Sequence, residues 1–112
     1  MKPVIKEGVA LISPQGFLDG NSAPAVFGLS ETSYLEMAKV RGLFISFKSI
    51  LFFNSNAIGY LTNVLEMVAS KQKIMVGFCD YNPQQYDLLT KYLGDEAMLT
   101  LFESFELAQI YL

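Results

Sequence analysis

The sequence contains no histidine, and its single cysteine is Cys79. Without histidine there can be no imidazole general base, no Ser-His-Asp or Cys-His catalytic group and no imidazole metal ligand. A lone cysteine forms neither an internal disulfide nor a Cys-x-x-Cys pair, and this one closes an apolar run, so we expect a buried structural thiol in a reducing, cytoplasmic compartment. Because no acid and base pair and no phosphate-binding loop can be nominated either, we expect a non-enzymatic protein without a metal or a cofactor.

Charge is also scarce. Only 17% of residues are charged, and the eight lysines and arginines are scattered along the chain, with a net charge of −3. No basic stripe follows a phosphate backbone, so nucleic acid is not an expected partner. The apolar run over residues 43–53 is interrupted by Ser46, Lys48 and Ser49 and falls short of the roughly 20 residues that span a bilayer. No membrane span is predicted.

What the sequence has is apolar content, 52% of its 112 residues, with a mean hydropathy of +0.33. This content excludes disorder and predicts a compact core. A chain of this length has too little apolar surface for two cores. Residues 1–112 are therefore expected to form one domain, and the apolar excess is also compatible with a homodimer.

Short apolar runs predict five strands. Residues 4–6 and 9–13 read as two strands joined by a tight turn at Glu7-Gly8. Residues 43–47 and 73–79 are nearly continuous apolar runs, the pattern of strands buried on both faces. Residues 97–101 are expected to form the last strand.

Helices are expected between these strands. The first is predicted over residues 24–39, weakened near Gly28, with Asn21 or Ser22 as its cap. The most regular amphipathic pattern is formed by Ala57, Ile58, Leu61, Val64, Leu65 and Val68. Asn82, with Gln85 three positions later, predicts a capping box for a helix that ends at Gly94, and Ser104 can cap a terminal helix.

The element order β-β-α-β-α-β-α-β-α predicts an α/β fold in two layers. Crossover helices between successive buried strands make a mainly parallel sheet. We expect about five strands in a mixed sheet and about four helices, mostly on one face.

Ligand sites in open α/β sheets lie where strand ends lead into helices. Two such loops are expected here, over residues 18–22 and 52–57. Asn54, Ser55 and Asn56 are good caps, so the simplest interpretation is a helix start that satisfies its own N–H groups. The same position would favour a phosphate on the Ser55 hydroxyl, which a separate kinase would have to supply. Phe52 and Phe53 are expected to be core and loop anchors.

The segment over residues 16–23 resembles the G-x-L-D-x-x-N/T-A signature of STAS domains, the module of bacterial anti-sigma factor antagonists and of sulfate transporter tails. Residues 43–57 resemble that family's central strand and phosphoacceptor turn, and residues 101–108 its final strand and helix. The likeness covers essentially the whole chain. It implies a stand-alone domain of STAS type with the element order given above.

The resemblance further implies a protein partner, often an anti-sigma factor with serine kinase activity, bound through the two loops. The family's phosphorylated serine falls on Ser55. The expected partner-binding residues are Asp19, Asn21, Ser22, Asn54, Asn56, Tyr60 and Asn63. The sequence departs from the family pattern because Asn54 replaces an aspartate, Asn56 a hydroxyl, Ala57 a glycine and Ser46 an aspartate on the preceding strand.

Two other hypotheses stay open. One is a constitutive scaffold of the same fold that has lost phosphoregulation, which the departures around Ser55 favour. The other is a small-ligand module that binds a nucleotide, an anion or a lipid at the same helix start, favoured by free N–H groups and high apolar content.

Overall fold

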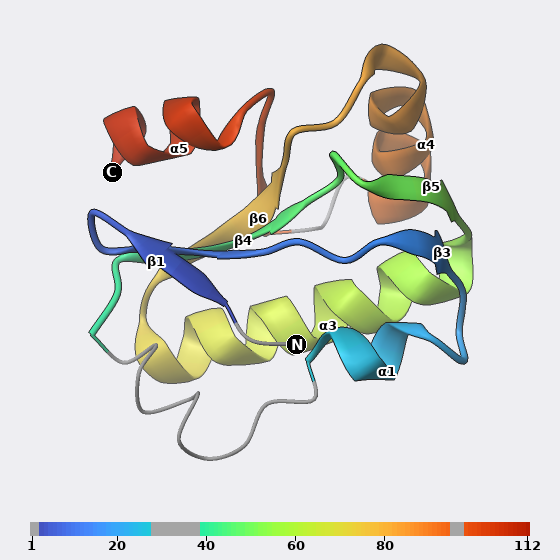
Figure 1. The fold of residues 1–112 in the computed structure, drawn as a ribbon. Coiled ribbons are helices and arrows are strands. Elements are labelled where there is room, and N and C mark those ends of the chain that lie inside the picture. Colours follow the sequence, from blue (N-terminus) through green and yellow to red (C-terminus); the bar gives the residue numbers. More distant parts are fainter. Residues whose placement is uncertain (1–2, 28–38, 95–97) are drawn as a thin grey trace.

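A computed structural model describes residues 3–27, 39–94 and 98–112. The main sheet has five strands in the spatial order β1 (Val4–Lys6), β2 (Val9–Ile12), β4 (Gly42–Ser46), β6 (Met75–Cys79) and β7 (Thr100–Phe102) (Figure 1). β1 and β2 are antiparallel, and every other neighbouring pair is parallel. The predicted mixed, mainly parallel five-stranded sheet is confirmed.

The turn between β1 and β2 is the predicted one. Glu7 has φ 52° and Gly8 φ 79°, and two positive values are what a two-residue type I′ hairpin turn requires. Arg41 fixes the turn from outside: its backbone N–H donates to the Gly8 carbonyl at 2.7 Å, and its guanidinium donates to the Glu7 carbonyl at 2.7 Å. The strand that follows ends at Ile12, ahead of Pro14.

Helices cover both faces of this sheet. α1 (Ala23–Val26) and α3 (Ser55–Gln72) lie on one face, α4 (Pro83–Leu93) packs against α3, and α5 (Phe105–Tyr111) lies on the opposite face (Figure 1). The helices are mostly on one side, as predicted, and α5 is the exception. No helix among these described residues is long and apolar enough to cross a membrane.

Two predicted elements extend into positions outside the described residues. Of the helix expected over residues 24–39, the structure describes α1 and then resumes at residue 39. The last strand, expected at 97–101, runs from Thr100 to Phe102, and residues 95–97 are outside the described part.

Alternation along the central strands explains their continuous apolar sequence. Leu43 and Ile45 of β4 face the larger core beneath α3, while Phe44 between them faces a smaller core under α5. Cys79 of β6 also belongs to the smaller core and is fully buried, so the predicted structural thiol is confirmed. Because both faces are covered, neither face of these strands needs polar residues.

A second sheet was not predicted. β3 (Gly16–Leu18) and β5 (Ile50–Phe53) pair in parallel, with Phe17 opposite Phe52 and Leu18 opposite Phe53. The paired side chains alternate: Leu18 and Phe53 are buried, whereas Phe17 and Phe52 are 68% and 52% exposed. Leu51 departs from this alternation, because the register shifts between Gly16 and Phe17 and Leu51 lies at the irregularity. The expectation of an anchored core residue is confirmed for Phe53. It is wrong for Phe52, whose ring contacts Phe17 on the surface with centroids 6.2 Å apart.

Candidate functional site

The start of α3 is organised by Asn54. Its backbone is extended (φ −121°, ψ 175°), and its side-chain oxygen accepts from the Ala57 N–H at 3.0 Å, the geometry of a helix N-cap. Its own N–H donates to the Leu18 carbonyl at 3.2 Å. The capping interpretation is therefore correct for Asn54, and the same residue ties the helix start to β3.

Ser55 is the first residue of α3 and is exposed. Within the described part of the chain, no hydrogen bond occupies its hydroxyl. The first turn of α3 contains no acidic residue. A phosphate on Ser55 would therefore meet the positive end of the helix dipole without repulsion from a carboxylate in its own first turn.

The 18–22 loop is held by its own aspartate. Asp19 Oδ1 accepts from the Asn21 N–H at 2.8 Å and from the Ser22 N–H at 2.9 Å. These backbone donors hold the pKa of the Asp19 carboxyl below its ordinary value of 3.8. Asp19 is half-buried, and its carboxyl group is ionised at neutral pH.

The predicted cap of α1 needs correction. Ser22 stands at the N-cap position, but its side chain makes no cap bond to the helix. Its hydroxyl donates instead to the Phe17 carbonyl at 3.1 Å and accepts from the Asp19 N–H at 2.9 Å. Asn21 is not the cap either. Its N–H and that of Ser22 donate to the Asp19 carboxylate, which forms an Asx turn ahead of the helix.

The structure brings the two predicted loops together. Besides the bond from Asn54 to Leu18, a side-chain carbon at Gly20 would lie 3.4 Å from Cβ of Asn56, so the loop rests against the first turn of α3. Tyr60 and Asn63, two of the expected partner-binding residues, lie on the exposed side of the same helix. We call this continuous region the loop–helix surface; it comprises Asp19, Asn21, Ser22, Asn54, Ser55, Asn56, Tyr60 and Asn63.

Exposed apolar side chains lie beside this surface and were not predicted. Leu51 is 78% exposed on β5, next to the exposed pair Phe17 and Phe52. A cavity of about 290 Å³ separates β5 from the start of α4, and Leu88 helps to line it. The sequence signal for this strand was the apolar run at 50–53, which is compatible with a short strand. Its partner β3 has only three residues, too few to show a periodic pattern.

A second polar cluster, also missed, lies at the ends of β4 and β6. Ser46 is 2% exposed, and its hydroxyl donates to Asp80 Oδ2 at 2.7 Å. The other oxygen of Asp80 accepts from the Phe105 N–H at 2.9 Å, the first N–H of α5. A carboxylate thus lies next to Ser46 although β4 itself carries none. Among the described residues, no group of three or more cysteine or acidic side chains could hold a metal ion.

Solved structures define the fold class of this arrangement. A candidate anti-sigma factor antagonist from Thermotoga maritima superposes with a TM-score of 0.71 over 97% of this chain and 91% of its own, at 15% identity. The anti-sigma factor antagonist SpoIIAA, in its unphosphorylated form, gives 0.64 over 96% and 91%, at 13% identity. The STAS domain of a SulP transporter from Vibrio cholerae gives 0.57 over 95% and 81%, at 19% identity.

The chain therefore has the STAS fold, as the sequence resemblance implied. No protein-family model and no curated protein matches it. At 13–19% identity the likeness defines the fold and leaves the activity to be argued from this chain's own residues. SpoIIAA has been solved both with and without phosphate, and that modification is a property of SpoIIAA.

Proposed function

We propose that residues 1–112 form a single, non-enzymatic STAS signalling domain of the anti-sigma factor antagonist type. It binds a protein partner, an anti-sigma factor or serine kinase, through the loop–helix surface. The observation that carries the proposal is the exposed Ser55 at the first position of α3, beside a loop that Asn54 ties to it. The free thiol of Cys79 fits the reducing environment of the cytoplasm, where we place the protein.

Phosphorylation of Ser55 would switch this binding. The partner kinase supplies the chemistry: the Ser55 oxygen bonds to the γ-phosphorus of ATP, ADP leaves, and the hydroxyl proton goes to a base of the kinase. The product carries about −1.5 to −2 charges at neutral pH. Asp19 is ionised in the adjoining loop, so the phosphate adds to negative charge already on the surface.

The size of this change is sufficient for a switch. Weakening the affinity for a partner a hundredfold requires about 2.7 kcal/mol. One partner carboxylate placed about 4 Å from the phosphate would be repelled by roughly 4 kcal/mol at an effective dielectric constant of about 20. Ser55 is exposed and makes no hydrogen bond within the described residues, so the modification requires no refolding.

The loop–helix surface would contact the partner mainly through neutral polar side chains. Asn21 and Asn56 are exposed side-chain amides on either side of the loop contact, and Asn63 extends the row along α3. Amides donate and accept hydrogen bonds without charge, so they tolerate both the phosphorylated and the unphosphorylated serine. The substitution of aspartate by Asn54 in the family's turn keeps the helix cap, since the amide oxygen accepts from Ala57.

The test is a pull-down from lysate of the host with wild type, Ser55→Asp and Ser70→Asp as baits, with retained proteins identified by mass spectrometry. Ser70 is exposed on the same helix about 22 Å along its axis, so it controls for added charge. We expect wild type and Ser70→Asp to retain a kinase-like ATPase or sigma regulator that Ser55→Asp loses. Phosphopeptide mapping of the protein from its host should find phosphate on Ser55.

Equal retention by all three baits, with no phosphate on Ser55, would contradict the switch and leave a constitutive scaffold. If no protein is retained, the small-ligand hypothesis takes precedence. In that case thermal unfolding with a panel of nucleotides, anions and lipids would show a shift for the class that binds.

A further inference from the structure

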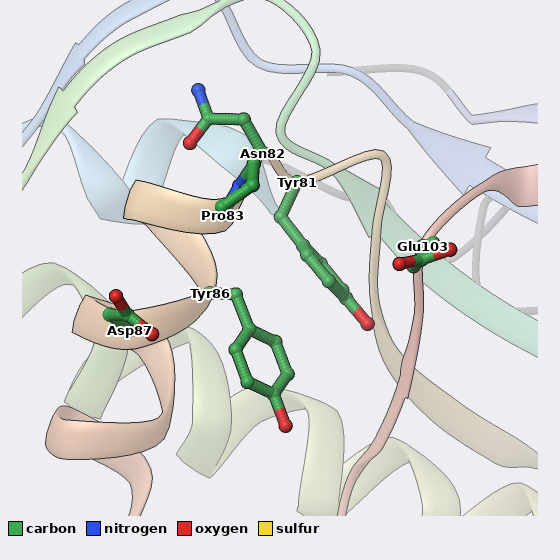
Figure 2. Close-up of a pocket in the computed structure, with 6 residues that line it drawn as sticks. All are labelled: Tyr81, Asn82, Pro83, Tyr86, Asp87 and Glu103. Carbon is green, nitrogen blue, oxygen red and sulfur yellow. The ribbon is translucent and has the colours of Figure 1, made fainter.

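A second concave site lies away from the loop–helix surface. A cavity of about 420 Å³ is formed between the start of α4 and the segment that joins β7 to α5. Figure 2 shows its lining, which is Tyr81, Asn82, Pro83, Tyr86, Asp87 and Glu103. These residues follow the carboxyl ends of β6 and β7, the edge where parallel α/β sheets place ligands. Among the residues that the structure describes, the lining contains two aromatic rings and two carboxylates and no basic side chain.

The two rings form a preorganised pair. The centroids of Tyr81 and Tyr86 are 5.4 Å apart with an interplanar angle of 39°. Tyr81 is half-buried, and Tyr86 is 43% exposed on the outer side. The helix start beneath them is locked by the capping box, in which Asn82 and Gln85 exchange hydrogen bonds of 2.8 and 2.9 Å. The aromatic faces therefore need little ordering when a ligand arrives.

The carboxylates lie on opposite sides of the tyrosine pair. In Figure 2, Glu103 is on the side of Tyr81, and Asp87 is on the side of Tyr86. Burial, with smaller contributions from Tyr86 and Glu103, raises the pKa of Tyr81 to about 12, so its ring is neutral at physiological pH. Two carboxylates therefore border the tyrosine pair in the lining of the cavity.

The helix start does not reverse this charge. Helix N-termini attract anions through free N–H groups, but most of those at the start of α4 are absent or already used. Pro83 has no N–H, Asn82 Oδ1 accepts from Gln85, and the Asn82 carbonyl accepts from the Tyr86 N–H at 2.9 Å. The sign of the site is therefore set by its carboxylates.

We propose that this pocket binds an organic cation, a guanidinium or alkylammonium group, against the rings of Tyr81 and Tyr86 and between Glu103 and Asp87. Cations of this kind are attracted to aromatic faces by the ring quadrupole and to carboxylates by charge. The volume of about 420 Å³ is large enough for a guanidinium or alkylammonium group together with part of the molecule that carries it. The site shares no residue with the loop–helix surface, so it stands or falls independently of the function proposed above.

The test is a titration followed in nitrogen-15 NMR spectra of the intact protein. The probe is methylguanidinium, and N-methylurea serves as its neutral control of nearly equal shape. We expect methylguanidinium to shift the backbone amides of residues 81, 82, 84–87 and 103 in a saturable manner, and N-methylurea to bind at least about tenfold more weakly. Raising the ionic strength should weaken the binding of methylguanidinium and leave the affinity for N-methylurea unchanged.

Variants separate the pocket from general attraction to an acidic protein. Glu103→Gln should lower the affinity for methylguanidinium by about three- to tenfold, and Tyr86→Leu should lower it by a similar factor. Tyr86→Phe keeps the ring, so its affinity should stay within about twofold of wild type. Glu66→Gln removes the same charge from α3, outside this cavity, and should also stay within about twofold. Both positions in the pocket are exposed, so these variants should fold and keep the spectrum of the core.

The proposal is overturned if N-methylurea binds as tightly as methylguanidinium, or if Glu103→Gln and Glu66→Gln have the same affinity for methylguanidinium. It is also overturned if the amide shifts appear near every carboxylate of the protein and do not saturate. A second arm identifies the source of the cation. If the blocked peptide acetyl-Gly-Arg-Gly-amide binds at least about tenfold more tightly than methylguanidinium, the group comes from a protein chain; equal affinity assigns the site to free small cations.

Discussion

The Asp80 carboxylate should contribute more to stability than any other single exposed or half-buried charge described here, because it joins three elements. It accepts from Ser46 at the end of β4 and from the Phe105 N–H at the start of α5, while Asp80 itself follows β6. α5 has only seven residues and covers the smaller core, so its start needs a tertiary anchor. We expect Asp80→Ala to destabilise the protein and Asp80→Asn to do so far less.

The magnitude follows from two hydrogen bonds to a charged group, at 2.7 and 2.9 Å. Each contributes about 1.5–3 kcal/mol, and the half-buried position favours the lower end, so the pair is worth about 3 kcal/mol. Asp80 also has φ 60°, a left-handed conformation that aspartate and asparagine tolerate and alanine does not, which adds about 1 kcal/mol. We predict a loss of about 4 kcal/mol for Asp80→Ala. Asparagine can still accept from the Phe105 N–H through its amide oxygen, and its amide N–H can donate to the Ser46 hydroxyl in place of the present bond, so Asp80→Asn should cost about 1 kcal/mol.

The assay is urea unfolding followed by far-ultraviolet circular dichroism, with free energies extrapolated to water. Native-state hydrogen exchange should show the amides of α5 opening first in Asp80→Ala. A loss below about 1 kcal/mol for Asp80→Ala, or equal losses for alanine and asparagine, would refute the reasoning, since neither fits a doubly bonded carboxylate.

Three further predictions test the loop–helix surface and its support. Asn54→Ala should cost about 1 kcal/mol in urea unfolding through the lost helix cap, whereas Ser55→Ala should be nearly neutral; equal losses would contradict the assigned cap. Phe53→Ala should cost about 3–5 kcal/mol, whereas Leu51→Ser, at the exposed position of the register irregularity in the same strand, should cost less than about 0.5 kcal/mol; similar melting temperatures for the two variants would argue against the pairing of β3 with β5. The pKa of Asp19, measured by carbon-13 NMR, should lie below 3.8; its stabilising effect is then present above that pH and is lost as the pH falls through the lowered value, and a pKa at or above 3.8 would mean that the loop bonds are absent in solution.

Local features could be predicted because their partners are close in the sequence. The capping box of Asn82 and Gln85 is confirmed in both of its bonds, and Ser104 caps α5 by accepting from the Leu107 N–H at 3.2 Å. Gly94 ends α4 with φ 69°, as predicted. Each of these depends on residues three or four positions apart, so the type and spacing of side chains are sufficient.

The candidate site was predicted only as two separate loops. Residues 18–22 and the start of α3 carry recognisable turn and cap residues, which the sequence displays directly. That they adjoin depends on β3 pairing with β5, a contact of segments more than thirty residues apart, with Leu18 bonding Asn54. The partner role of these residues stays a prediction.

By itself the sequence determined the order of the strands in the main sheet, its mainly parallel pairing and the ends of α4 and the start of α5, because periodicity and caps depend on residues only a few positions apart. The tertiary structure alone decided that Phe52 is exposed, that α5 covers the opposite face and that Ser46 meets Asp80. These outcomes depend on which distant segments pair despite the entropy lost in loop closure, and on the face that each strand then turns to the core. Local residue patterns encode neither of these.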